Sequence, residues 1–170
     1  LVTGDVRYNQ TATLKDVSVV AAAGSILTAA NLVLDNNALV GSTAEPLNID
    51  VATIELDGLD GQAYISNTGD LVIKNMENMD FLVDITSVGS ISDDEGGSPL
   101  ISSGIVSLTS ETSDIDLVND NQLSGVLNLS ARNTVSINNG LTVLGNVNAE
   151  SLFVQSAVNI EDTENGVITV

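Results

Sequence analysis

Short runs in which two aliphatic residues flank one other residue recur along this chain, and they restrict the folds it can adopt. In an extended strand, the two flanking residues point to one side and the residue between them points to the other. Each run is therefore typical of a short strand with one buried face. The clearest pairs are Val106/Leu108, Ile115/Leu117, Leu127/Leu129, Val135/Ile137, Leu141/Val143, Leu152/Val154 and Val158/Ile160.

The pairs also recur at a longer interval. A loose period of just over twenty residues, with two or three short strands in each period, indicates a parallel β-helix. Loop insertions would account for the drift in the period. The intervals from Val106 to Leu127, from Ile115 to Val135, from Leu127 to Leu152 and from Val135 to Val158 are 21, 20, 25 and 23 residues.

The sequence therefore predicts an all-β chain that folds as a single-stranded parallel β-helix, or β-solenoid, of about eight coils. We expect residues 1–170 to form one solenoid segment of a longer protein, because both ends of the sequence are strand-like. Residues 90–103 interrupt the rhythm with acidic, glycine and proline residues, and they predict a loop that protrudes from the solenoid wall.

Composition excludes several classes of function. Only four residues are aromatic, namely Tyr8, Tyr64, Phe81 and Phe153, although 43% of the chain is hydrophobic. The absence of cysteine and histidine rules out disulfides, thiolate metal sites and histidine-based catalysis. A net charge of −19 argues against binding to nucleic acid or to an anionic membrane surface. No apolar run is long enough to cross a bilayer, so we expect no membrane insertion.

Three segments resemble the filamentous-haemagglutinin-like repeats of large secreted bacterial adhesins: Gly24–Leu34, Leu39–Ile54 and Ala63–Ile73. They contain a Gly-Ser-Thr-x-x-Pro-Leu turn, alternating strands and the phrase Asn-Thr-Gly-Asp-Leu, and residues 138–141 and 145–147 look similar. The resemblance implies a right-handed β-helix shaft, export as a very large polypeptide, and a role in adhesion or biofilm cohesion. It carries no catalytic residues.

Clustered acids raise the alternative of calcium binding, since carboxylate oxygens are ligands for hard cations. Asp57 and Asp60 flank glycines in one such cluster, although a tight turn is the simpler reading. Asp93, Asp94 and Glu95 form a second cluster, for which an exposed acidic loop is the simpler reading. The third segment, Asn119-Asp120-Asn121, is most simply a corner turn. We expect no cofactor, with calcium as the open possibility.

The sequence favours a non-enzymatic role, because no acid, base and aromatic residue gather in one motif. We expect a structural shaft segment of a bacterial adhesin or extracellular fibre, secreted or at the cell surface. Two alternatives stay open: a glycan- or receptor-binding module on a β-helix scaffold, and a calcium-stabilised fibre subunit that assembles with itself. The expected partners are other copies or neighbouring coils of the same adhesin and, in the binding alternative, a host or matrix glycan or surface.

Overall fold

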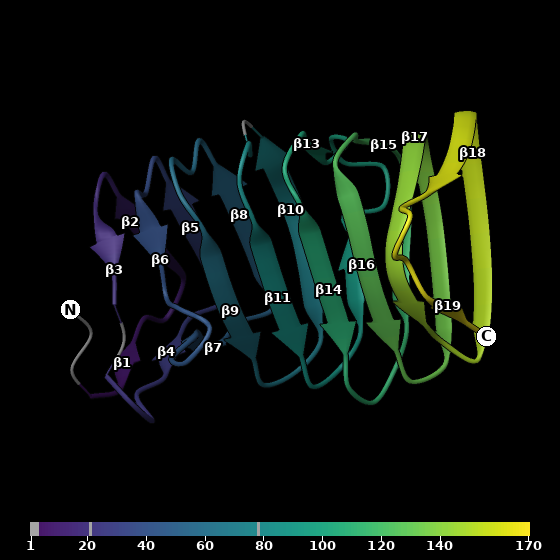
Figure 1. Cartoon of the computed structure of the whole chain (residues 1–170). Coiled ribbons are helices and arrows are strands. Elements are labelled where there is room, and N and C mark those ends of the chain that lie inside the picture. Colours follow the sequence, from purple (N-terminus) through teal and green to yellow (C-terminus); the bar gives the residue numbers. More distant parts are fainter. Residues whose placement is uncertain (1–3, 21, 78) are drawn as a thin grey trace.

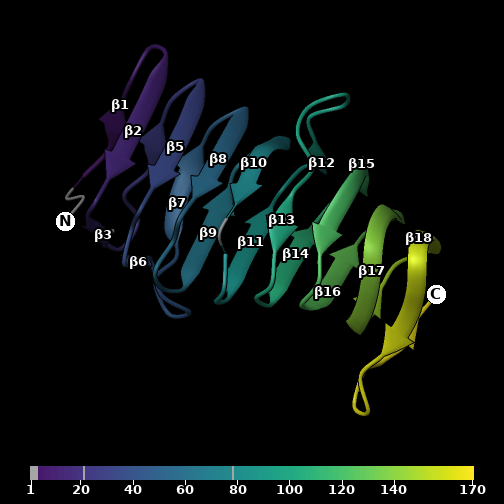
Figure 2. The same cartoon turned by 90° about the horizontal axis from the view of Figure 1, so that it is seen from above.

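The chain is wound into a stack of coils that lie side by side along one axis, with its two ends at opposite ends of the stack (Figures 1 and 2). This arrangement comes from a computed structural model that describes residues 4–20, 22–77 and 79–170. The described part contains no helix, and its strands pair in parallel across neighbouring coils. The predicted parallel β-solenoid of about eight turns is confirmed.

One side of every coil is an extended strand that stacks on its counterparts in the coils before and after it. We call this side the first wall. In order along the axis it consists of β2 (Thr11–Lys15), β5 (Asn31–Asp35), β8 (Thr53–Asp57), β10 (Leu71–Glu77), β12 (Ile91–Asp93), β15 (Ile115–Leu123), the start of β17 (Thr134–Asn148) and β18 (Ser151–Asp162).

The second wall faces the first across the interior. Its strands are β3 (Ser18–Val19), β6 (Leu39–Val40), β9 (Ala63–Asn67), β11 (Val83–Ser87), β14 (Val106–Ser110), β16 (Val126–Ala131), the end of β17 and β19 (Ile168–Thr169). In the early coils this wall also contains β1 (Val6–Arg7), β4 (Leu27–Thr28) and β7 (Leu47–Asp50).

A turn interrupts the second wall between β6 and β7. Both strands pair with the single strand β9, because Val40 lies beside Ala63 and Leu47 lies beside Ile65. The intervening residues 41–46 therefore have no counterpart inside the wall and lie outside it as a rim. This rim borders the candidate site described below.

The segment 90–103 contributes more to the walls than the sequence predicts. Its two ends are strands, β12 and β13 (Ile101–Ser102), and β13 pairs with the end of β15 on a third, shorter side of the coil. Leu100 is buried as well. The excursion is therefore confined to residues 94–99, of which 95–98 are exposed, whereas the sequence predicts a loop over residues 90–103.

The interior is a set of aliphatic columns that run along the stack. On the first wall, Leu32, Ile54 and Ile73 lie in register and are fully buried. Because each coil covers the inward side chains of the next, no single coil needs large residues to fill the core. On the second wall one such column consists of Val40, Ala63, Val83, Val106 and Leu127.

The period shortens in the last coils, contrary to the sequence-based intervals. Leu127 lies beside Leu144 and Val135 lies beside Leu152, so both intervals are 17 residues. The predicted partners at intervals of 25 and 23 residues are wrong. Register shifts within β15, β16 and β17 absorb the difference, since a β-bulge changes how many residues one strand spends opposite another.

One bulge also reverses the direction of a predicted pair. Leu141 and Val143 were expected to point inward, but the buried residues are Thr142 and Leu144. The register shift between Asn139 and Leu141 explains the reversal, because a slip of one residue moves every later side chain to the opposite face.

Candidate functional site

The first calcium candidate lies on a turn. Asp57 ends β8 and is half-buried, whereas Asp60 is exposed. Between them Gly58 has a φ of 58°, a left-handed conformation that glycine adopts without strain. The backbone N–H of Asp60 donates to the carbonyl oxygen of Asn37 at 3.1 Å, which fixes the turn to the previous coil.

The second calcium candidate is divided between the interior and the surface. Asp93 is buried, and its carboxylate accepts hydrogen bonds from the backbone N–H groups of Val118 at 2.9 Å and Asn119 at 3.0 Å. Asp94 is half-buried and Glu95 is exposed on the loop. Across residues 4–20, 22–77 and 79–170, no three acidic side chains come close enough together to hold a metal ion.

The third candidate lies where β15 passes from the first wall to the third side of the coil, so it forms a corner, although within a continuous strand and not in a separate turn. Residues 119–121 lie within β15 where its register shifts. The buried Asn121 donates to Asp93 at 2.9 Å and accepts from the backbone N–H of Leu100 at 2.8 Å. The exposed Asp120 accepts from Asn138 at 2.9 Å. Asn121 thus fastens the start and the end of the 94–99 loop to the following coil, whereas Asp120 connects that coil to the next one.

Other acidic residues connect neighbouring coils at the surface, and the sequence analysis missed this role. The carboxylate of Asp70 accepts from the backbone N–H of Ser90 at 2.8 Å and from its hydroxyl at 2.9 Å. These bonds hold the pKa of Asp70 below its usual value. Asp114 accepts from the backbone N–H of Thr134 at 2.8 Å in the same manner. This role could have been predicted from the sequence, because each of these acids directly precedes the first apolar residue of a strand.

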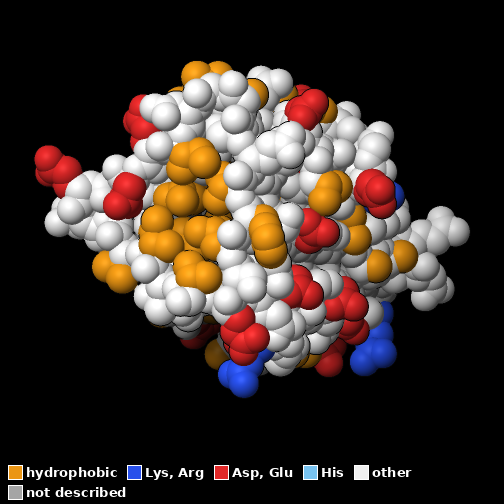
Figure 3. Space-filling view, turned by 90° about the vertical axis from the view of Figure 1, so that its right-hand side faces the viewer, with side chains coloured by type: hydrophobic (Ala, Val, Ile, Leu, Met, Phe, Trp, Pro, Cys, Tyr) orange, Lys and Arg blue, Asp and Glu red, His pale blue; other side chains and the backbone are white. Residues whose placement is uncertain are grey.

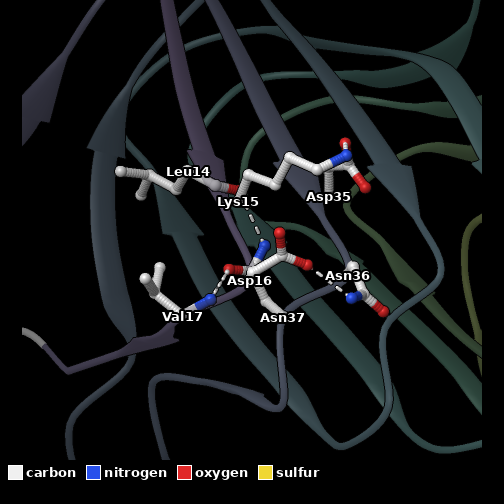
Figure 4. Close-up of polar contacts among 7 residues, drawn as sticks. All are labelled: Leu14, Lys15, Asp16, Val17, Asp35, Asn36 and Asn37. Carbon is white, nitrogen blue, oxygen red and sulfur yellow. Dashed lines mark hydrogen bonds and ion pairs between the residues drawn. The ribbon is translucent and has the colours of Figure 1, made fainter.

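The corner where β2 and β5 end shows a similar connection in the first coils (Figure 4). The buried Asn37 donates to the carbonyl oxygen of Leu14 at 2.9 Å and accepts from the backbone N–H of Val17 at 3.4 Å. Outside it, the ammonium of Lys15 lies 2.6 Å from the carboxylate of Asp35. This hydrogen bond and the charge of Asp35 raise the pKa of Lys15.

A small cleft opens on the outer face of the second wall, and no sequence motif pointed to it. Tyr64 and Ser66 of β9 and Asp84 and Thr86 of β11 form its floor, because Tyr64 lies beside Asp84 and Ser66 beside Thr86. The rim at residues 41–46 closes one side. The cleft has a volume of about 190 Å³.

Asp84 is the distinctive group of this cleft. Its carboxylate is half-buried, and burial raises its pKa. No side chain or backbone group of the described residues forms a hydrogen bond or an ion pair with it. A partly desolvated carboxylate without a partner is unfavourable for folding, so its presence beside an aromatic ring calls for an explanation.

The last described coil differs from the others in the exposure of its apolar residues. An apolar patch is visible on this end in Figure 3. Leu152 and Val154 pack against the core but are only partly buried. Phe153 is 63% exposed and Val158 is 79% exposed, so the inward position predicted for Val158 is wrong. Ile160, which lies beside the buried Thr142, is exposed as well.

Comparison of the chain with protein families, with curated proteins and with solved structures finds no match in any of the three. Within the described residues, no helix has the length and apolar character needed to cross a membrane.

Proposed function

We propose that this chain is a structural shaft segment of a secreted bacterial surface adhesin or extracellular fibre, and that it supports cell adhesion or biofilm cohesion. One observation carries the proposal: parallel strands follow one another from β2 to β18, and no element of the described residues folds back between them. Such a stack can be extended by further coils of the same kind, which is the property that a shaft requires.

The direction of the hydrogen bonds supports the same role. Bonds between parallel strands run along the axis of the stack, so they resist a pull along that axis. The side chains of Asp70, Asp114 and Asn37 add further bonds between successive coils at the corners. The resemblance of residues 24–73 to filamentous-haemagglutinin-like repeats points to the same class of protein.

Immunogold labelling tests this proposal. An antibody raised against this chain is applied to intact cells of the organism that encodes it, and to permeabilised cells as a control. The proposal predicts labelling on intact cells, along filaments that project from the surface. Labelling that requires permeabilisation would overturn it.

A genetic experiment tests the contribution to adhesion. In-frame removal of the coding sequence for residues 1–170 should reduce surface adherence or biofilm cohesion while leaving the remaining polypeptide exported. Unchanged adherence and cohesion with normal export would contradict the proposed role.

A further inference from the structure

We propose that the cleft formed by Tyr64, Ser66, Asp84, Thr86 and the rim at residues 41–46 binds a neutral saccharide. This inference does not depend on the shaft role, because a shaft needs no ligand. The cleft differs from the rest of the surface in the environment of its carboxylate. On a chain with a net charge of −19, most surface carboxylates are simply hydrated. Asp84 is instead half-buried in a hollow beside an aromatic ring.

The polar groups of the cleft have unused hydrogen-bonding capacity. The carboxylate of Asp84 and the hydroxyls of Ser66 and Thr86 form no hydrogen bond with the described residues. A carboxylate accepts at both oxygens, and a hydroxyl both donates and accepts. The cleft therefore offers a convergent set of acceptors, with some donors, to a ligand that carries several hydroxyl groups.

The aromatic ring supplies the second element of sugar recognition. Tyr64 lies beside Asp84 on the neighbouring strand, and its hydroxyl donates to Gln62 at 3.0 Å, which holds the ring in place. An amphipathic ring can pack against the apolar C–H face of a sugar while the sugar hydroxyls reach polar neighbours. A carboxylate that accepts from such hydroxyls forms the stronger, charge-assisted type of hydrogen bond.

The rim is fixed in position before any ligand arrives. The backbone N–H of Ser42 donates to the carbonyl oxygen of Glu45 at 2.9 Å, and the N–H of Glu45 donates to the Ser42 hydroxyl at 3.1 Å. Gly41 has a φ of 64°, and a Cβ there would collide with the backbone of Tyr64. Only glycine fits this close approach of the rim to β9, so the site is largely preformed.

The size and charge of the cleft limit which sugars it can bind. At about 190 Å³ the cleft is smaller than a site for a drug-sized molecule, so it suits a single sugar ring, which can be one unit of a longer glycan. An acidic sugar would be repelled by Asp84 and by the overall charge. We expect weak binding, with a Kd of about 1 mM, because a single ring makes few contacts.

Nuclear magnetic resonance titration of the whole 170-residue chain tests the proposal. The probes are the methyl glycosides of glucose, galactose and mannose, and N-acetylglucosamine, each added to about 50 mM so that a millimolar Kd is saturated. Saturable shifts confined to the amides of Tyr64, Ser66, Asp84 and Thr86 are expected with at least one probe. Glucuronate, added in the same way, is the negatively charged control. If no neutral probe shifts these amides, or if only glucuronate does, the proposal is overturned.

Variants test the roles of the ring and the carboxylate. Asp84→Asn and Tyr64→Ala should each weaken binding at least tenfold, whereas Tyr64→Phe should retain most of it. The matched control is Asp116→Asn, which removes the same charge from an exposed position on the first wall and should leave binding unchanged. Binding that is unaffected by Asp84→Asn would overturn the proposal. The dispersion of the amide signals reports whether each variant is folded. If Tyr64→Ala is unfolded, the binding of the Asp84→Asn variant alone tests the proposal.

Discussion

The inner side of the first wall differs between its early and its late coils. In the early coils an unbroken aliphatic column contains Leu32, Ile54 and Ile73. In the next coil the same column continues with Asp93, which lies beside Ile73. The buried Asn121 donates a hydrogen bond to the carboxylate of Asp93. The coil that contains Asp93 is therefore held by buried hydrogen bonds in addition to the aliphatic packing of Ile91 and Leu100.

This difference shows what each type of interior permits. An aliphatic column is stabilised by burial, which has no preferred direction and favours plain repetition. A polar coil needs every buried group paired, so its hydrogen bonds specify one local path. Asp93 marks the point where the 94–99 loop leaves the wall, and Asn139 marks the bulge that shortens the following coil. The polar positions therefore allow irregularity inside a regular stack.

Ile54→Ala, in the aliphatic coils, should have the largest effect among single substitutions. Ile54 is fully buried between Leu32 and Ile73, and its truncation leaves a cavity that neighbouring coils cannot fill. We expect a loss of about 4 kcal/mol in the free energy of unfolding, measured by urea denaturation. The matched control is Glu55→Ala on the outward side of the same strand, which should cost less than about 0.5 kcal/mol. Similar losses for the two variants would refute an inward column at this position.

Asp93→Ala should cost about 3 kcal/mol, because it removes the acceptor of the Val118 and Asn119 N–H groups and of the buried Asn121 amide. Asp93→Asn should be milder, since one amide oxygen can still accept. Glu95→Ala, at an exposed position on the loop, serves as the control and should be close to neutral. If Asp93→Ala is also close to neutral, the polar coil is not held by these bonds.

These two regions also show how far the sequence alone could lead. The pairing of Val106 with Leu127 and of Ile115 with Val135 was predictable, because covalent spacing and alternation carry that information. The burial of Asp93 was not, since an acid in a glycine-rich segment is far more often exposed. The inward position of Thr142 was hidden as well, because a bulge leaves no clear mark in a polar sequence.

The candidate cleft was harder still to predict. Tyr64 and Asp84 are 20 residues apart, and only the register between β9 and β11 brings them together. The unequal lengths of the coils place residues 41–46 beside them. A correct period can predict a neighbour in the next coil, but it cannot predict which outward positions are hollowed.

The two surface acids Asp70 and Asp84 differ in the direction of their pKa shifts, and each shift predicts a small effect on stability. The pKa of Asp70 is lower in the folded than in the unfolded state. The ionised carboxylate therefore stabilises the fold at any pH above its unfolded-state pKa, and this stabilisation is lost as the pH falls through the folded-state pKa. Asp70→Ala should therefore cost less than about 1 kcal/mol at pH 7, because the site is exposed, and less than that at pH 2. Thermal melts of both proteins across this pH range measure the difference. A cost that is undiminished at pH 2 would show that the ionised carboxylate is not its source.

Asp84 should give the smallest effect, with the opposite sign. Burial raises the pKa of Asp84, so its ionised form destabilises the fold at neutral pH. This cost disappears as the pH falls through the raised folded-state pKa towards the unfolded-state pKa. Asp84→Asn should stabilise the protein by about 0.5 kcal/mol at pH 7. The gain should vanish near pH 3, as measured by chemical denaturation at both pH values. A destabilised variant at pH 7 would indicate a structural role for the carboxylate in place of a ligand-binding one.

Removal of one whole coil tests most directly the claim that the chain is a stack of in-register parallel coils. Deletion of residues 63–82 places Val83 where Ala63 was and keeps every later strand in register, whereas deletion of residues 63–83 shifts the following strand by one residue. The account predicts that the first deletion melts cooperatively and is shorter by about 4.8 Å in X-ray scattering, and that the second melts at least about 10 °C lower. If both deletions melt alike, or if the first one unfolds, the stacked-coil account is contradicted.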